Sequence, residues 1–160
     1  HAQTMIAIAG AKGELAHLQP APGTPEHRRC RFWMHYAEGS LMNWLVMKLV
    51  FTNIPRQPMP FFAKPIARAL CAKVQQQLID PNVDTALAFM EEHLGRHTWF
   101  AGEHLSMADF QMSFAVEAAL SRSAKAEDCP HLQAYAARMR ARPAYQRAVE
   151  KGGPVVMAAS

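Results

Sequence analysis

The chain has 160 residues, of which 50% are hydrophobic and 19% are charged, and its formal net charge is +4. This length and composition predict one domain that buries a real core, and they exclude a disordered tail. The basic residues are spread along the chain without a tight patch of cations and stacking aromatic rings. We therefore expect no nucleic-acid partner.

The cysteines and the apolar runs indicate the redox compartment of the protein and its relation to membranes. Cys30, Cys71 and Cys129 are odd in number and lack the spacing of a disulfide framework or a zinc site. This pattern favours a reducing, cytoplasmic location. The longest apolar stretch, residues 41–54, is interrupted by polar side chains and is shorter than the roughly 20 apolar residues that span a bilayer. We therefore expect no membrane partner.

The first predicted element is a long helix. Residues 20–25, "PAPGTP", cannot be helical, whereas Thr24 as N-cap and Pro25 at the first helical position form a start signal. We expect the helix to run from about Pro25 to Phe51. Two neighbouring stripes of it carry apolar and aromatic residues. One stripe holds Cys30, Trp33, Ala37, Leu41, Trp44 and Lys48, and the other holds Phe32, Tyr36, Gly39, Asn43 and Met47.

Two further helices are predicted after a proline-rich connection. Four prolines within residues 52–65 indicate a loop, and residues 66–79 then resume a helical period. Asp80 followed by Pro81 is typical of a new helix start. Gly95 stands where the end of that helix would favour a left-handed residue. Because no segment alternates like a strand, the fold class is all-α.

The segment "WFAGEHLSMADF", residues 99–110, carries a strong helix start. With Ser106 as N-cap, Asp109 is the third helical position, so the two residues can form a capping box. Leu105 and Phe110 have the spacing of a hydrophobic staple. The residues from Phe110 to position 120 are almost all apolar around the helix axis, which predicts a central helix with a buried N-terminus.

Two chemical readings compete with this structural one. Ser106 and Asp109 could form a catalytic arrangement with His97 or His104, but no nucleophile elbow precedes the serine and the cap already explains both side chains. His93 and His97 are the one histidine pair at a spacing of four residues. No third or fourth ligand is indicated, so we expect no metal.

The capping segment resembles the C-terminal helical domain of bacterial glutathione S-transferases. Residues 15–42 resemble the domain junction and first long helix of these enzymes, and residues 131–152 resemble their closing helices with the "RPAYQRA" pattern. The resemblance implies a helical bundle over residues 20–160, with residues 1–19 as a linker and the end of a preceding domain. The thioredoxin-like domain that supplies the catalytic residue and most of the glutathione site in that family has no counterpart here. We therefore expect a fragment that contains no catalytic residue.

The resemblance also implies a role for the helices. In that family the helical domain forms one wall of the site for an electrophilic or disulfide co-substrate and part of a homodimer interface, with glutathione as the other substrate. His35, Tyr36, Ser40 and Asn43 are the candidate substrate-binding residues, because they place polar groups beside Phe32. The isolated domain would be inactive.

Two alternatives stay open at this point. Trp33, Tyr36 and Trp44 could simply pack the core or a dimer interface. The whole domain could instead be a stand-alone protein–protein interaction module of the same fold.

Overall fold

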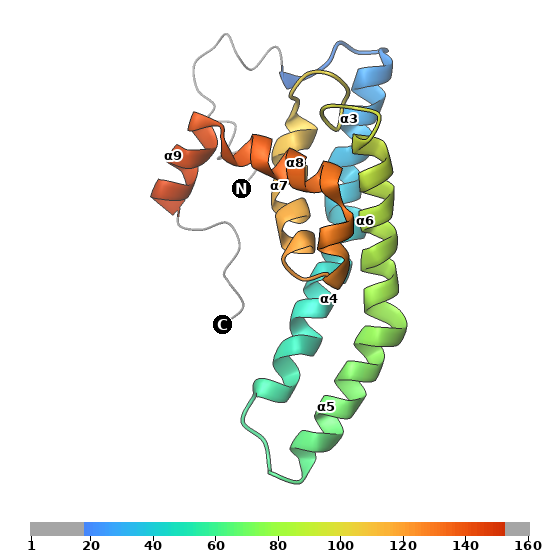
Figure 1. Ribbon diagram of the computed structural model, residues 1–160, viewed down its shortest axis with the longest axis vertical. Helices are drawn as coiled ribbons and strands as arrows, with labels where there is room; N and C mark the ends of the chain where they lie inside the picture. The colour runs from blue at the N-terminus through green and yellow to red at the C-terminus, as the bar shows by residue number, and fades with distance from the viewer. Residues whose placement is uncertain (1–17, 153–160) are drawn as a thin grey trace.

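The computed structural model describes residues 18–152, and the elements of this range are helical (Figure 1). Its β pairing is limited to an isolated bridge between Trp99 and Gly102. The predicted all-α class is therefore confirmed. Of the predicted linker, residues 1–19, only Leu18 and Gln19 fall within the described range.

The first long helix is continuous and contains a π turn. It comprises α3 (Pro25–Tyr36), the π turn η1 (Ala37–Leu41) and α4 (Met42–Asn53). Thr24 caps it as predicted, because its hydroxyl oxygen accepts the His27 N–H at 3.2 Å. A 3₁₀ turn, η2 (Ile54–Arg56), extends it beyond the expected end at Phe51.

The second long helix is also continuous, so the predicted helix start at Asp80 and Pro81 is wrong. It comprises α5 (Ala63–Val74), the π turn η3 (Gln75–Ile79) and α6 (Asp80–Leu94). Asp80 has helical φ and ψ of −61° and −44°, and its N–H donates to the carbonyl of Gln75. A proline inside an α-helix clashes with the carbonyl four residues earlier. The wider π turn just before Pro81 relieves that clash, so the helix continues.

The left-handed conformation predicted for Gly95 is also wrong. Its φ is −67° and its ψ is −20°, which any residue adopts. A Cβ at this position would meet the His131 ring at 3.4 Å, an ordinary van der Waals contact. Positive φ occurs instead at Gly23, with 87°, and at Gly102, with 149°. Gly102 lies in the tight loop that leads into the next helix.

The central helix α7 (Met107–Leu120) packs against α3, α4 and α8. Its buried residues surround the axis, as the sequence predicts, although Phe114 is 43% exposed. They are Ala108, Asp109, Met112, Ser113, Ala115, Val116, Ala118 and Ala119. A helix buried on most sides belongs inside a bundle.

The described range ends with a 3₁₀ turn and two helices, η4 (Ala124–Asp128), α8 (Pro130–Arg140) and α9 (Pro143–Gly152). The α8 N-terminus is capped from α6. The two carboxylate oxygens of Glu91 accept the N–H groups of His131 and Leu132, each at 2.9 Å. In Figure 1, α4 and α5 run together beyond the other helices and meet at the lower end of the molecule. The turn that joins these two helices therefore projects away from the rest of the bundle.

Candidate functional site

The predicted substrate-binding face begins with three aromatic rings on two helices. Phe32 and Tyr36 of α3 stack with ring centroids 5.7 Å apart, and Phe89 of α6 lies 5.5 Å from Tyr36 and 6.1 Å from Phe32. Phe32 is 49% exposed and Phe89 is 42% exposed. Burial raises the pKa of the Tyr36 hydroxyl above its usual value. The three residues therefore form an apolar aromatic face with a neutral hydroxyl on it.

The other three predicted residues lie farther along the same long helix. His35, Ser40 and Asn43 are exposed. The Asn43 amide donates to the carbonyl of Gly39 at 3.0 Å, within the π turn. Among the described residues, no side-chain hydrogen bond joins His35, Tyr36, Ser40 and Asn43 to one another. The four share one side of the first helix but do not form a closed pocket by themselves.

The face rests on the buried Trp33 and the partly buried His93. The Trp33 ring lies 4.7 Å from the rings of His93 and Phe100. His93 Nε2 is 3.0 Å from the Phe100 carbonyl, and burial lowers the pKa of its imidazole. The carbonyl can only accept, so Nε2 carries the proton and donates it, and this bond ties His93 of α6 to the loop before α7. Within the part of the chain that the structure describes, no three metal-ligating side chains come together.

Ser106 and Asp109 form a capping box at the start of α7. The Asp109 carboxylate accepts the Ser106 N–H at 2.8 Å, the Ser106 hydroxyl at 2.9 Å and the Phe100 N–H at 2.9 Å. Ser106 is 1% exposed and Asp109 is 0% exposed. In the described range, neither His97 nor His104 hydrogen-bonds to Ser106. The pair therefore holds the loop and the helix start together and lacks the base that a serine nucleophile needs.

We expect the stability of the protein to depend on pH through Asp109. Burial raises the pKa of this carboxyl from 3.8 to about 6, although hydrogen bonds from Phe100, from Ser106 and from the backbone of Asp109 itself act in the opposite direction. The folded state therefore holds the proton more tightly than the unfolded chain. This contribution is complete below about pH 4 and is lost as the pH rises to about 6, a change of about 2 to 3 kcal/mol.

Urea unfolding of the parent protein and of Asp109→Asn, measured over this pH range, provides the check. The amide does not titrate, so the difference between the two free energies of unfolding should change between about pH 4 and 6 and be constant above about pH 7. A difference that is constant throughout would contradict the raised pKa.

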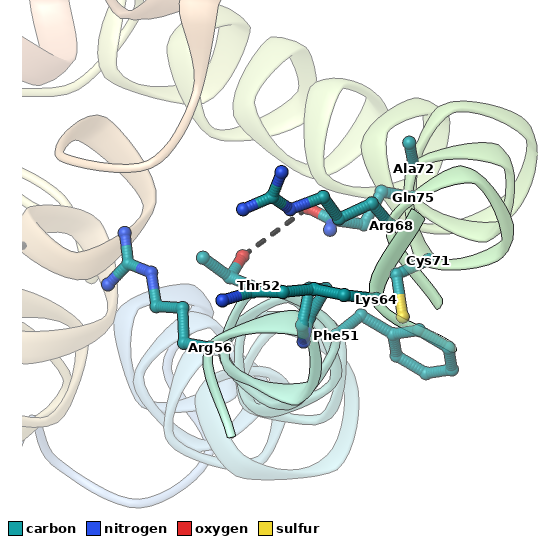
Figure 2. A pocket seen from close by; sticks show the side chains of 9 residues that line it. Phe51, Thr52, Arg56, Lys64, Arg68, Cys71, Ala72 and Gln75 are labelled. Carbon is teal, nitrogen blue, oxygen red and sulfur yellow. Dashed lines mark hydrogen bonds between the residues drawn. The ribbon is translucent and has the colours of Figure 1, made fainter. Parts of the chain in front are cut away.

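A hollow that the sequence did not predict lies between α4 and α5, away from the predicted face. Its volume is about 570 Å³. The residues that line it are Phe51, Thr52, Pro55, Arg56, Lys64, Arg68, Cys71, Ala72 and Gln75. Figure 2 shows the side chains of Arg56, Lys64 and Arg68 projecting into the same space, beside the Thr52–Gln75 contact of 3.4 Å. No carboxylate lines it, so it is a basic hollow with an apolar wall.

Comparison with known proteins places these helices in a family. The family described as "Glutathione S-transferase, C-terminal domain" matches residues 59–143. Glutathione S-transferase 3 of Schizosaccharomyces pombe is 29% identical over 94 residues, which cover 59% of this chain and 38% of that protein. Glutathione S-transferase 1 of Saccharomyces cerevisiae is 26% identical over 122 residues, which cover 75% of this chain and 52% of that protein. The chain therefore spans about half or less of these curated relatives.

A solved structure shows the same fold. The crystal structure of a glutathione S-transferase from Actinobacillus pleuropneumoniae superposes with a TM-score of 0.60 and 21% sequence identity, over 94% of this chain and 61% of that chain. The family match covers more than half of the chain and includes the central helix α7. The chain belongs to the glutathione S-transferase C-terminal domain family.

Proposed function

We propose that this chain is the co-substrate-binding and dimerisation domain of a glutathione transferase. The observation that carries the proposal is the half-exposed aromatic face of Phe32, Tyr36 and Phe89. Flat apolar rings with one hydroxyl suit an electrophile or disulfide that must be held near a glutathione thiolate. Glutathione itself would bind mainly in a separate thioredoxin-like domain. The isolated chain would then lack activity.

His35, Ser40 and Asn43 extend the proposed wall along the helix. Their exposed side chains offer an imidazole, a hydroxyl and an amide beside the rings. Such groups can orient a mostly apolar ligand without transferring a proton to it. Their proposed role is positioning, so their loss should raise KM more than it lowers kcat.

The outer side of α4 supports the dimerisation part of the proposal. Val46, Leu49 and Val50 are 50%, 46% and 48% exposed and follow one another along the helix surface. A contiguous exposed apolar strip of this kind is typical of an interface between copies. The unpaired buried cysteines agree with a cytosolic setting.

The test uses the complete product of the gene and glutathione conjugation to a chlorodinitrobenzene. Tyr36→Ala is expected to raise KM for the electrophile about 5- to 20-fold, because a lost aromatic contact in a pocket costs about 1 to 2 kcal/mol of binding. KM for glutathione should stay within about twofold. Leu78→Ala, at an exposed apolar residue on η3, is the matched control and should leave both values unchanged.

Two results would contradict the proposal. One is a Tyr36→Ala variant that raises KM for glutathione and for the electrophile equally. The other is a gene product that neither binds glutathione nor conjugates it, but retains protein partners in stoichiometric amounts. That second result would favour the interaction-module function.

A further inference from the structure

The two helices that extend from the bundle have a one-sided charge. Residues 39–79 contain five basic residues and no Asp or Glu. The basic residues are Lys48, Arg56, Lys64, Arg68 and Lys73. Lys48 is paired with Asp80 at 2.8 Å, where this segment joins the body of the fold. The rest of this arm, which we name the α4–α5 arm, presents cations without an acidic residue of its own.

The tip of the α4–α5 arm carries an exposed aromatic pair. Phe61 is 88% exposed and Phe62 is 65% exposed, and their rings meet edge to face with centroids 5.7 Å apart. Ile66, which follows on α5, is 68% exposed. Figure 1 places this turn at one end of the long axis of the molecule. Nothing in the described part of the fold covers these rings, so they form a projecting apolar wedge.

Two basic residues, Lys64 and Arg68, follow the wedge on α5. Arg56, Lys64 and Arg68 project into the hollow between the two helices (Figure 2). Within the described range, Lys64 and Arg68 form no ion pair. The hollow also holds the side-chain amide of Gln75. Guanidinium, ammonium and amide donors around one space suit phosphate oxygens.

We propose that the tip of the α4–α5 arm docks on the surface of an anionic phospholipid bilayer. The Phe61 and Phe62 rings enter the boundary between headgroups and acyl chains, and Lys64 and Arg68 bind lipid phosphates above it. Aromatic rings prefer that boundary, and basic side chains beside it are attracted to acidic lipids. Among residues 18–152, no helix is long and apolar enough to cross a membrane. The proposed contact is therefore peripheral, and it departs from the expectation of no membrane partner, which rested only on the length of the apolar runs.

Charge complementarity favours a lipid surface over a second copy of the chain and over a nucleic-acid strand. A second copy seated on the tip would place its own Lys64 and Arg68 opposite these two cations, and like charges repel, whereas the proposed dimer contact lies farther along α4. A nucleic-acid strand needs rings that are separately available for stacking along a groove. Here the two exposed rings contact each other edge to face at the tip of the arm. An acidic lipid supplies both the anion and the apolar layer that this arrangement matches.

The experiment is co-sedimentation of the 160-residue chain with vesicles of phosphatidylcholine alone or phosphatidylcholine mixed with phosphatidylserine. Binding to the mixed vesicles only, reduced at high salt, is the expected result. Lys64→Gln with Arg68→Gln should weaken the partition coefficient about 25-fold, because each charge contributes about fivefold. Phe61→Ser with Phe62→Ser should weaken it at least tenfold. Circular dichroism would verify that each variant is folded. If the double phenylalanine variant does not fold, Phe61→Ser alone is tested in its place.

A charge-matched control separates docking from general attraction. Arg31→Gln with Lys151→Gln removes two exposed basic residues from α3 and α9 and should leave the partition coefficient within about twofold. Equal loss in this control would overturn the proposal, and so would unchanged vesicle binding after both phenylalanines are replaced. The proposal also fails if inorganic phosphate binds equally well without vesicles. It fails too if the double phenylalanine variant is a monomer where the parent chain is a dimer. Displacement of the protein from the vesicles by single-stranded nucleic acid would also contradict it.

Discussion

Replacing Asp109 by alanine is expected to lower the free energy of unfolding at pH 7 by about 3 to 5 kcal/mol. The carboxylate is 0% exposed and accepts three hydrogen bonds, two of them from backbone N–H groups. Alanine would leave the Phe100 and Ser106 N–H groups buried without an acceptor. Each unsatisfied buried donor costs about 1 to 3 kcal/mol, and the small cavity adds to this.

The cost exceeds that of an ordinary helix cap because Asp109 joins two segments. A surface N-cap is worth about 1 kcal/mol. Here the same carboxylate also fixes Phe100, in the loop that is closed by the Trp99–Gly102 pair, with N–H to oxygen distances of 2.8 and 3.0 Å. The buried hydroxyl of Tyr135 donates to the Asp109 carbonyl at 2.8 Å. The substitution therefore disturbs the loop, α7 and α8 together.

Urea unfolding measures the loss, and two variants calibrate it. Ser106→Ala removes one neutral donor to the carboxylate and should cost about 1 kcal/mol. Asp128→Ala removes an exposed carboxylate and should change stability by less than about 0.5 kcal/mol. If Asp109→Ala costs no more than Ser106→Ala, the buried junction does not have the stabilising role assigned to it.

Features set by neighbouring residues could be predicted from the sequence. The Thr24 cap follows from local spacing and is present, as are the Ser106–Asp109 box and the inner stripe of Cys30, Trp33, Ala37 and Leu41. In each case the feature depends on a fixed spacing along one segment: three residues for the caps and the helical period for the stripe. The sequence alone was sufficient for the all-α class and for the central helix.

Features that join distant segments could not be predicted in the same way. Pro81 signals a helix start locally, but the π turn before it lets the helix continue. The hollow needs Thr52 and Arg68 to face each other across two helices, which no spacing along one helix reveals. The one signal in the sequence is that residues 39–79 contain no Asp or Glu, which indicates a basic surface but not a hollow. The role of His35, Tyr36, Ser40 and Asn43 stays a prediction.

The second large effect is expected for Trp33→Ala, which should lower the free energy of unfolding by about 3 to 5 kcal/mol. Trp33 is 1% exposed. Its ring contacts five others from α3, α6 and the loop before α7, at centroid distances from 4.7 to 5.2 Å. These neighbours are Phe32, Tyr36, Phe89, His93 and Phe100. Alanine would remove the one side chain that they all share.

The size of the cavity that a substitution leaves distinguishes a core residue from a surface residue. Phe32→Ala, which truncates a 49% exposed ring in the same cluster, should cost only about 1 kcal/mol, because much of its area already meets water. Trp33→Phe should cost about 1 to 2 kcal/mol and leave a folded protein. Equal losses for Trp33→Ala and Phe32→Ala in urea unfolding would show that Trp33 does not support the cluster.

Trp33→Phe also connects stability to the proposed site. Tyr36 and Phe89 lie on the Trp33 ring at 5.2 and 5.1 Å, so a smaller ring beneath them lets the aromatic face settle inward. In the complete gene product, this variant should raise KM for the electrophile about two- to fivefold, while KM for glutathione stays constant. A change confined to thermal stability would mean that the face does not bind the co-substrate. Trp33 is 1% exposed, so it cannot contact the electrophile itself. A change in KM for the electrophile alone must therefore act through the Tyr36 and Phe89 rings that Trp33 contacts.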